Sequence, residues 1–120
     1  SDVLIAGDLN TMGCRECPSV ERSGAEAGWL DTRLRAFQPL MRRIPSDLGC
    51  SHYYQRHPSQ LDHFIVTSAM KEAAKVQSFS VYGHCRLLQC DDYTGADPEA
   101  LQHLSDHCPI AVTLIDQDID

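Results

Sequence analysis

Val3-Leu4-Ile5-Ala6-Gly7-Asp8-Leu9-Asn10 is the stretch from which the fold of this chain can be worked out. Its apolar start predicts a β-strand that is buried on both faces. Side chains alternate along a strand, so Asp8 and Asn10 are expected to project to one side and Leu9 to the other. Polar groups at a strand end often build a catalytic site, but Asp and Asn also favour a simple turn there. This stretch alone leaves both interpretations open.

Composition indicates one globular domain spanning residues 1–120. Hydrophobic residues make up 42%, which argues against disorder, and no apolar run approaches the ~18 residues of a membrane span. The net charge of −7 comes from residues 61–120, which hold three basic and ten acidic residues. A local basic cluster, formed by Arg33, Arg35, Arg42 and Arg43, could contact phosphates or be a solvated helix face.

Six cysteines, at positions 14, 17, 50, 85, 90 and 108, admit several interpretations. They could form up to three disulfides. The N-terminus lacks the features of a signal peptide, which favours reduced thiols and an intracellular protein. The chain also starts almost inside a strand, so we expect further sequence before Ser1. A zinc site could use Cys14 and Cys17 with Cys50, His52, His84, Cys85 or Cys90, although the second half of such a site lacks a paired spacing. Buried thiols are the preferred interpretation.

Periodicity predicts the remaining elements. An apolar stripe of Leu30, Leu34 and Phe37 predicts a helix over 29–37, and alternation with Phe79 and Val81 facing the core predicts a strand over 76–82. We expect further strands over 61–67 and 110–115, a helical turn over 68–75, a helix over 98–104 capped by Asp97, and loops over 46–60 and 84–96.

Polar groups also stand beside two other predicted strands. Asp62 begins the strand over 61–67, and Ser105-Asp106-His107 precedes the last strand. If these strands share a sheet, Asp8, Asn10, Asp62 and His107 can converge. Such a set suits phosphate-ester hydrolysis: a carboxylate activates water, a divalent cation neutralises phosphoryl oxygens, and an amide and an imidazole donate hydrogen bonds. Asp62 could orient His107.

Three stretches of the chain, in this order, resemble motifs of the endonuclease/exonuclease/phosphatase superfamily, which has the DNase I-like fold. Gly7-Asp8-Leu9-Asn10 matches its GD-x-N motif, Leu61-Asp62-His63-Phe64-Ile65-Val66 is similar to its (I/L)-D-Y-(I/F)-L motif, and Ser105-Asp106-His107-Cys108-Pro109-Ile110 matches its SDH-x-P-(I/V) motif. Within that superfamily, the residues of these motifs are most similar to those of the exonuclease III/apurinic-site endonuclease branch.

The resemblance implies a role for each matched residue. Asp8 would activate water, Asn10 would bind the phosphate, and Asp62 would pair with His107. His107 would stabilise charge on the phosphoryl oxygens or act as an acid/base, and Asp106 would contribute to a site for Mg²⁺ (or Mn²⁺). The implied function is a metal-dependent nuclease acting on nucleic acid, with DNA favoured. A phosphatase acting on phosphoinositides or small phosphoesters, and a non-catalytic fragment, remain alternatives.

The resemblance covers only the C-terminal half of that fold. The expected fold class is therefore α/β (α+β): half of a four-layer sandwich, with one mixed or antiparallel sheet covered by helices. The upstream Asn and metal-binding Glu of the family have no matching motif here, and Gln60 stands where a basic residue usually precedes the second motif. Half a sandwich would expose an apolar sheet face, so we expect association with a second copy or with an N-terminal half.

Overall fold

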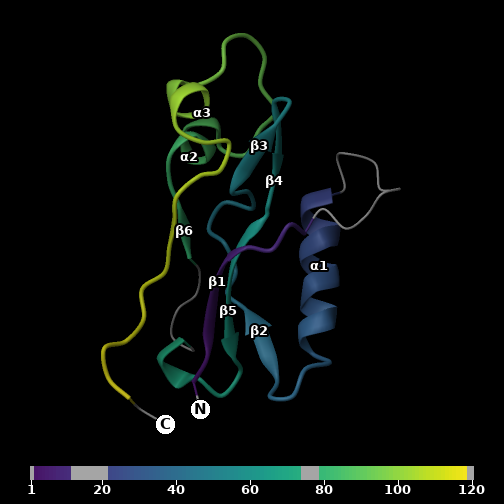
Figure 1. The fold of residues 1–120 in the computed structure, drawn as a ribbon, viewed down its shortest axis with the longest axis vertical. Coiled ribbons are helices and arrows are strands. Elements are labelled where there is room, and N and C mark those ends of the chain that lie inside the picture. The colour runs from purple at the N-terminus through teal and green to yellow at the C-terminus, as the bar shows by residue number, and fades with distance from the viewer. Residues whose placement is uncertain (1, 12–21, 74–78, 119–120) are drawn as a thin grey trace.

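A three-stranded antiparallel sheet forms the centre of the structure, a computed structural model that describes residues 2–11, 22–73 and 79–118 (Figure 1). The strands are β1 (Leu4–Asp8), β5 (Asp62–Thr67) and β2 (Met41–Arg43), in the order β1-β5-β2. The domain is thus a small mixed α/β unit with antiparallel sheets and few helices, which confirms the coarse fold class. Its extents of 50 × 33 × 19 Å make it elongated.

Burial along the sheet differs from the expectation for β1. The central strand β5 is almost wholly buried, as its continuous β-branched and aromatic sequence requires. The prediction that β1 is buried on both faces was wrong, because β1 is an edge strand whose apolar residues, including Leu4 and Ile5, are exposed. The alternation of side chains along β1 cannot tell an edge strand from a central one.

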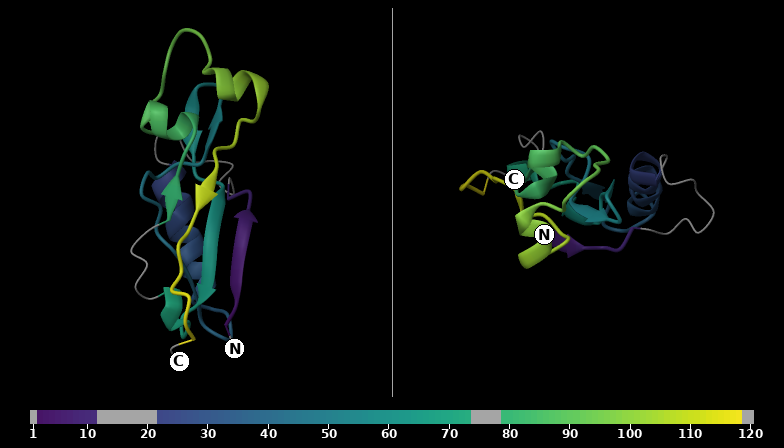
Figure 2. Two further views of the ribbon diagram at one scale, coloured as in Figure 1. Left: turned by 90° about the vertical axis from the view of Figure 1, so that its left-hand side faces the viewer. Right: turned by 90° about the horizontal axis from the view of Figure 1, so that it is seen from above.

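Helix α1 (Arg22–Leu34) covers one face of the sheet (Figure 2). Leu30 and Leu34 pack with Met41 of β2 and Ile65 of β5 in a small apolar cluster. The predicted stripe is therefore confirmed for two of its three residues. Phe37 is exposed, because the helix ends at Leu34.

The larger core lies on the other face of the sheet, where Phe64 and Val66 of β5 point. It is covered by β6 (Ser80–Val81), which pairs with β7 (Ile110–Ala111), and by the segment that follows β7. Phe79 and Val81 are fully buried, as their alternation predicts. Both strands are shorter than expected, and residues 76–78 of the predicted strand lie outside the described residues. The 3-10 helix η1 (Lys71–Ala73) confirms part of the predicted helical turn.

A β-hairpin replaces the loop predicted over 46–60. Its strands β3 (His52–Tyr54) and β4 (His57–Ser59) are joined by two residues, Gln55 and Arg56, with φ of 49° and 69°. Positive φ at both positions is the conformation of a type I′ turn, which usually carries Asn-Gly or Asp-Gly. The hairpin escaped prediction because its turn lacks those residues.

Two short helices lie at the same end of the domain as the hairpin, away from the two chain termini (Figure 1). Helix α2 (His84–Leu88) lies in the segment predicted to be irregular, so that prediction was wrong for these residues. Helix α3 (Glu99–His103) confirms the predicted helix, but its N-cap is Pro98 without a side-chain cap. Asp97 instead accepts a hydrogen bond from the Tyr93 hydroxyl at 2.7 Å.

Two disulfides tie these helices to the rest of the chain. Cys50 is bonded to Cys90, and Cys85 of α2 is bonded to Cys108. The preference for reduced thiols was therefore wrong for these four cysteines, which the fold brings to Cα separations of 5.7 and 6.1 Å, within bonding range. The paired sulfurs are also not available to a zinc ion. Cys14 and Cys17 lie outside the described residues.

None of the helices in the described part of the chain has the length and apolar character that crossing a bilayer requires.

Candidate active site

The sheet brings two motif carboxylates directly opposite each other. In the antiparallel pairing of β1 with β5, Asp8 is the partner of Asp62, so both side chains stand on the same face. Gly7, just before Asp8, has φ of 149°, a conformation that other residues rarely adopt. Like charges placed opposite each other repel, so this pair calls for a cationic or hydrogen-bonding group nearby.

His107 supplies that group. Its Nδ1 lies 2.8 Å from Oδ2 of Asp62, and its Nε2 lies 3.7 Å from Oδ2 of Asp8. Three residues predicted from separate motifs are thus brought together around one imidazole. The side chain of His107 is 31% exposed and that of Asp8 is 41% exposed, so a ligand in solvent can reach both.

The loop carrying His107 is held against the hairpin by backbone hydrogen bonds. The N–H of Tyr53 donates to the carbonyl of Asp106 at 3.0 Å, and the N–H of Cys108 donates to the carbonyl of Ser51 at 2.7 Å. At this point His52 and His107 form an isolated antiparallel β-bridge. The hairpin that sequence patterns missed therefore positions the imidazole.

Ser51 fixes the carboxylate that faces His107. Its hydroxyl donates to Oδ2 of Asp62 at 2.7 Å and accepts the N–H groups of Leu61 and Asp62 at 3.1 and 3.0 Å. Ser51 is fully buried, so water cannot take over these bonds. No sequence signal singled out this serine, because its role depends on contacts with residues ten and eleven positions away.

Asn10 contacts Asp8 through its backbone, and Asp106 lies beside His52. Asn10 has φ of 49°, which ends the strand alternation, and its backbone N–H donates to Oδ1 of Asp8 at 2.8 Å. Asp106 presents a carboxylate that is 57% exposed, with Oδ2 at 3.4 Å from Nε2 of His52. Among the described residues, His52, Asp106 and His107 offer ligand atoms that all lie within 4.8 Å of one another.

The carboxylates favour the charged form of His107. Burial alone would lower the pKa of this imidazole. The hydrogen bond and charge of Asp62, together with the charges of Asp8 and Asp106, outweigh burial and raise the pKa above the ordinary 6.5. The surrounding carboxylates therefore favour an imidazolium that can donate a hydrogen bond from Nε2.

The pKa of His52 is shifted in the opposite direction from that of the neighbouring His107. Burial first, and then the nearby His107, lower its pKa below 6.5 despite the attraction of Asp106. Its ring is 4.8 Å from the His107 ring, centroid to centroid, and its Nδ1 lies 2.8 Å from Oγ of Ser59. A buried imidazole whose pKa is lowered thus stands beside a partly exposed one whose pKa is raised. In the sequence, His52 stood out only as a potential zinc ligand.

A second buried histidine supports the site from the other face of the sheet. Nε2 of His63 lies 3.1 Å from Oγ1 of Thr11, whose hydroxyl donates to the carbonyl of Gln60 at 2.8 Å. Burial, followed by the charge of Arg43, lowers the pKa of His63. Because Thr11 directly follows Asn10, these bonds anchor the chain where it leaves β1.

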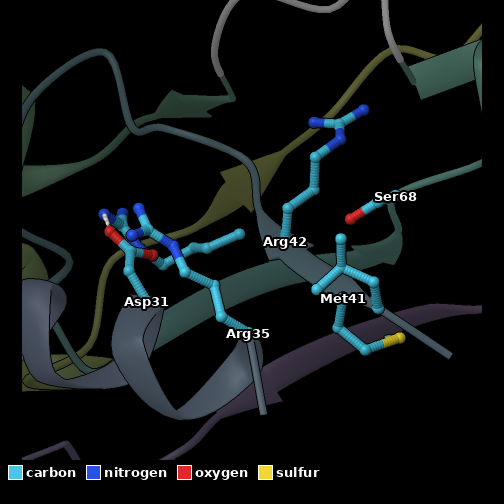
Figure 3. Close-up of a pocket in the computed structure, with 7 residues that line it drawn as sticks. Asp31, Arg35, Met41, Arg42 and Ser68 are labelled. Carbon is cyan, nitrogen blue, oxygen red and sulfur yellow. Dashed lines mark hydrogen bonds and ion pairs between the residues drawn. The ribbon is translucent and has the colours of Figure 1, made fainter. Parts of the chain in front are cut away.

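The predicted basic cluster lies elsewhere. Arg43 binds both carboxylate oxygens of Asp31 at 3.0 and 3.1 Å, and Figure 3 shows Arg35 beside Asp31 with Arg42 extending away from them. These residues line a pocket of about 300 Å³ between α1 and β2. The register pairs the β2 residues of this pocket, Met41 to Arg43, with Thr67 to Ile65, which lie five to three residues along β5 from Asp62, or about 16 to 10 Å. Phosphate binding there stays a prediction, and the pocket is separate from His107.

Comparison with known proteins adds no assignment. No family model matches the chain, and no curated protein or solved structure is significantly similar to it. The function must therefore be argued from the geometry of the site.

Proposed function

We propose that this chain carries the water-activating and charge-stabilising part of a metal-dependent phosphodiesterase that acts on nucleic acid, with DNA as the favoured substrate. In this proposal it is the C-terminal half of a DNase I-like four-layer sandwich and works within a larger catalytic domain. The proposal is supported by the pairing of β1 with β5 and by the resemblance of three sequence stretches to the motifs of that superfamily.

The observation that carries the proposal is the position of His107 between two carboxylates. Asp62 holds one ring nitrogen, so the other faces the side on which Asp8 lies. An imidazolium held in this way can donate to a phosphoryl oxygen and stabilise the charge that develops on it. Asp8, 41% exposed, can accept a proton from an attacking water. Such a pair of roles suits in-line attack of water on phosphorus.

The exposed carboxylate of Asp106 fits the Mg²⁺ (or Mn²⁺) that the resemblance implies. Mg²⁺ is usually held by one or two carboxylates, substrate phosphate and several waters, and a side chain that is 57% exposed leaves room for them. When bound, the ion would neutralise charge on the phosphate. Further ligands could come from the upstream half of the domain.

The openness of the site favours a polymer over a small phosphoester. Small-molecule sites enclose most of their ligand, whereas Asp8 and Asp106 stand at the surface. A pocket of about 340 Å³ adjoins His107. It is lined by Gly83, His84, Ala100, Leu104, Ser105, His107, Cys108 and Pro109.

Association through β1 belongs to the same proposal. The strand has a partner, β5, on one side within the described part of the chain. The strand and the residues that flank it are 37–45% exposed at Val3, Leu4, Ile5 and Leu9. An exposed apolar edge strand invites pairing with another chain. We therefore expect a homodimer or a complex with an N-terminal half.

A hydrolysis assay on intact and abasic DNA duplexes, with Mg²⁺, Mn²⁺ or chelator, tests the proposal. We expect metal-dependent cleavage that falls ~10²–10⁴-fold in His107→Ala and Asp8→Asn. The matched control is His57→Ala, because His57 is exposed and pairs with Asp92 away from the site. If His107→Ala and His57→Ala cleave equally fast, the site is wrong.

A binding measurement covers the case in which hydrolysis needs the rest of the domain. A non-hydrolysable phosphorothioate dinucleotide should shift the ring NMR signals of His107 and leave those of His57 in place. Unchanged His107 signals at a saturating concentration would contradict the proposal.

A further inference from the structure

The two imidazoles beside Asp106 form a donor set that differs from the oxygen ligands preferred by Mg²⁺. His52, Asp106 and His107 provide two nitrogens and a carboxylate within 4.8 Å of one another. Imidazole suits Zn²⁺, Co²⁺ and Ni²⁺, whereas Mg²⁺ takes oxygen. The cluster therefore selects a different class of ion from the one expected for phosphodiester hydrolysis.

Each ring already has the outer partner that metal-binding histidines need. Nδ1 of His52 is 2.8 Å from the Ser59 hydroxyl, and Nδ1 of His107 is 2.8 Å from the Asp62 carboxylate. Such bonds to one nitrogen fix the ring and leave Nε2 as the nitrogen available to a metal. Two different elements, β4 and β5, supply these partners.

The spacing of one ligand pair, His52 and Asp106, suits a tetrahedral ion. Two ligands about 2.05 Å from zinc at the tetrahedral angle are about 3.4 Å apart. Nε2 of His52 lies 3.4 Å from Oδ2 of Asp106. The His52 side chain is only 6% exposed, so its nitrogen is held in place, whereas the exposed Asp106 and the partly exposed His107 can adjust. Three protein ligands leave the fourth position for water.

We propose that His52, Asp106 and His107 form a binding site for Zn²⁺ or a similar transition-metal ion, distinct in chemistry from an activating Mg²⁺. On binding, Nε2 of His107 releases its proton to solvent and donates its lone pair to the metal. If the proposed function holds, the ion removes the hydrogen-bond donor and occupies Asp106, so Zn²⁺ inhibits hydrolysis. The inhibition rests on the proposed function, whereas the binding does not.

Direct titration with Zn²⁺, and with Co²⁺ followed by its visible absorption, tests the site. A Cys14→Ser/Cys17→Ser background removes the two cysteines outside the described residues as alternative zinc ligands. We expect one ion per chain, affinity in the order Zn²⁺ > Co²⁺ > Mn²⁺ with Mg²⁺ weakest, and a loss of at least ~100-fold in His52→Gln. Ser59→Ala should cost ~10–100-fold, because it removes only the outer partner. His57→Gln, on an exposed histidine of the same hairpin, should leave the affinity unchanged.

Two outcomes overturn the inference. One is Zn²⁺ affinity in His52→Gln equal to that in His57→Gln. If His52→Gln fails to fold, exposed Asp106→Asn takes its place, and undiminished Zn²⁺ affinity there has the same meaning. The other is no stoichiometric Zn²⁺ binding by the background chain. Either result leaves the proposed hydrolysis standing. Zn²⁺ binding with neither metal-dependent cleavage nor a dinucleotide-induced shift of the His107 signals would contradict the proposed function alone.

Discussion

Replacing Ser51 by alanine should destabilise the domain far more than the loss of one hydroxyl suggests. The change removes the acceptor of two N–H groups, the buried one of Leu61 and the partly buried one of Asp62, and one donor to the Asp62 carboxylate. Each buried N–H without an acceptor costs about 1–3 kcal/mol, and a hydrogen bond to a charged group contributes about 1.5–3 kcal/mol. We expect a loss of about 3–4 kcal/mol, near the lower sum, because partly exposed Asp62 can recruit water.

Urea denaturation followed by far-UV circular dichroism measures this loss. The matched control is Ser46→Ala, since the Ser46 hydroxyl accepts a single local N–H, that of Leu48, at 3.3 Å. Its removal should cost about 0.5–1.5 kcal/mol. Equal free energies of unfolding for the two variants would refute the reasoning that Ser51 organises the start of β5.

Three further predictions concern pH, the disulfides and association. The pKa of His63 in the folded protein lies below its unfolded value of 6.5, so the unfolded chain binds a proton at this imidazole more readily than the folded chain does. The contribution of His63 should therefore lower the free energy of unfolding as the pH is lowered from about 7.5 to about 5.5. The fall should be less steep in His63→Gln. Cys85→Ser should lower the free energy of unfolding by about 3 kcal/mol under oxidising conditions, because the Cys85–Cys108 bond closes a separation of 23 residues, and should have little effect in reductant. Ile5→Lys should shift sedimentation toward the monomer, and a wild-type chain that is already monomeric at high concentration would contradict association through β1.

The parts of the site that sequence could predict are those that local patterns encode. The run that ends in Asp8 and the β-branched run after Asp62 both indicate strands, and the structure pairs them so that the two carboxylates face each other. That these carboxylates meet His107 was expected because all three residues stand beside predicted strands, which could share a sheet. The side chain of Asn10 was predicted to project to the same side as that of Asp8, because side chains alternate along a strand. The positive φ of Asn10 interrupts this alternation.

The rest depends on tertiary contacts that leave no periodic signal. The β3–β4 turn has Gln55 and Arg56 in left-handed conformations without glycine or asparagine, so its strands resembled a loop. Ser51 and His52 acquire their roles only through this hairpin. The cysteine pairing, likewise, is set by distances that the sequence does not contain.

A double-substitution cycle on Asp62 and His107, read out as the rate of phosphodiester hydrolysis in saturating Mg²⁺, tests most directly whether these residues act as one unit. Asp62→Asn and His107→Ala should each slow hydrolysis strongly, and the double variant should be little slower than the worse single one, because Asp62 acts through the imidazole that it holds at 2.8 Å. Rate losses that simply multiply in the double variant would mean that the two side chains work independently.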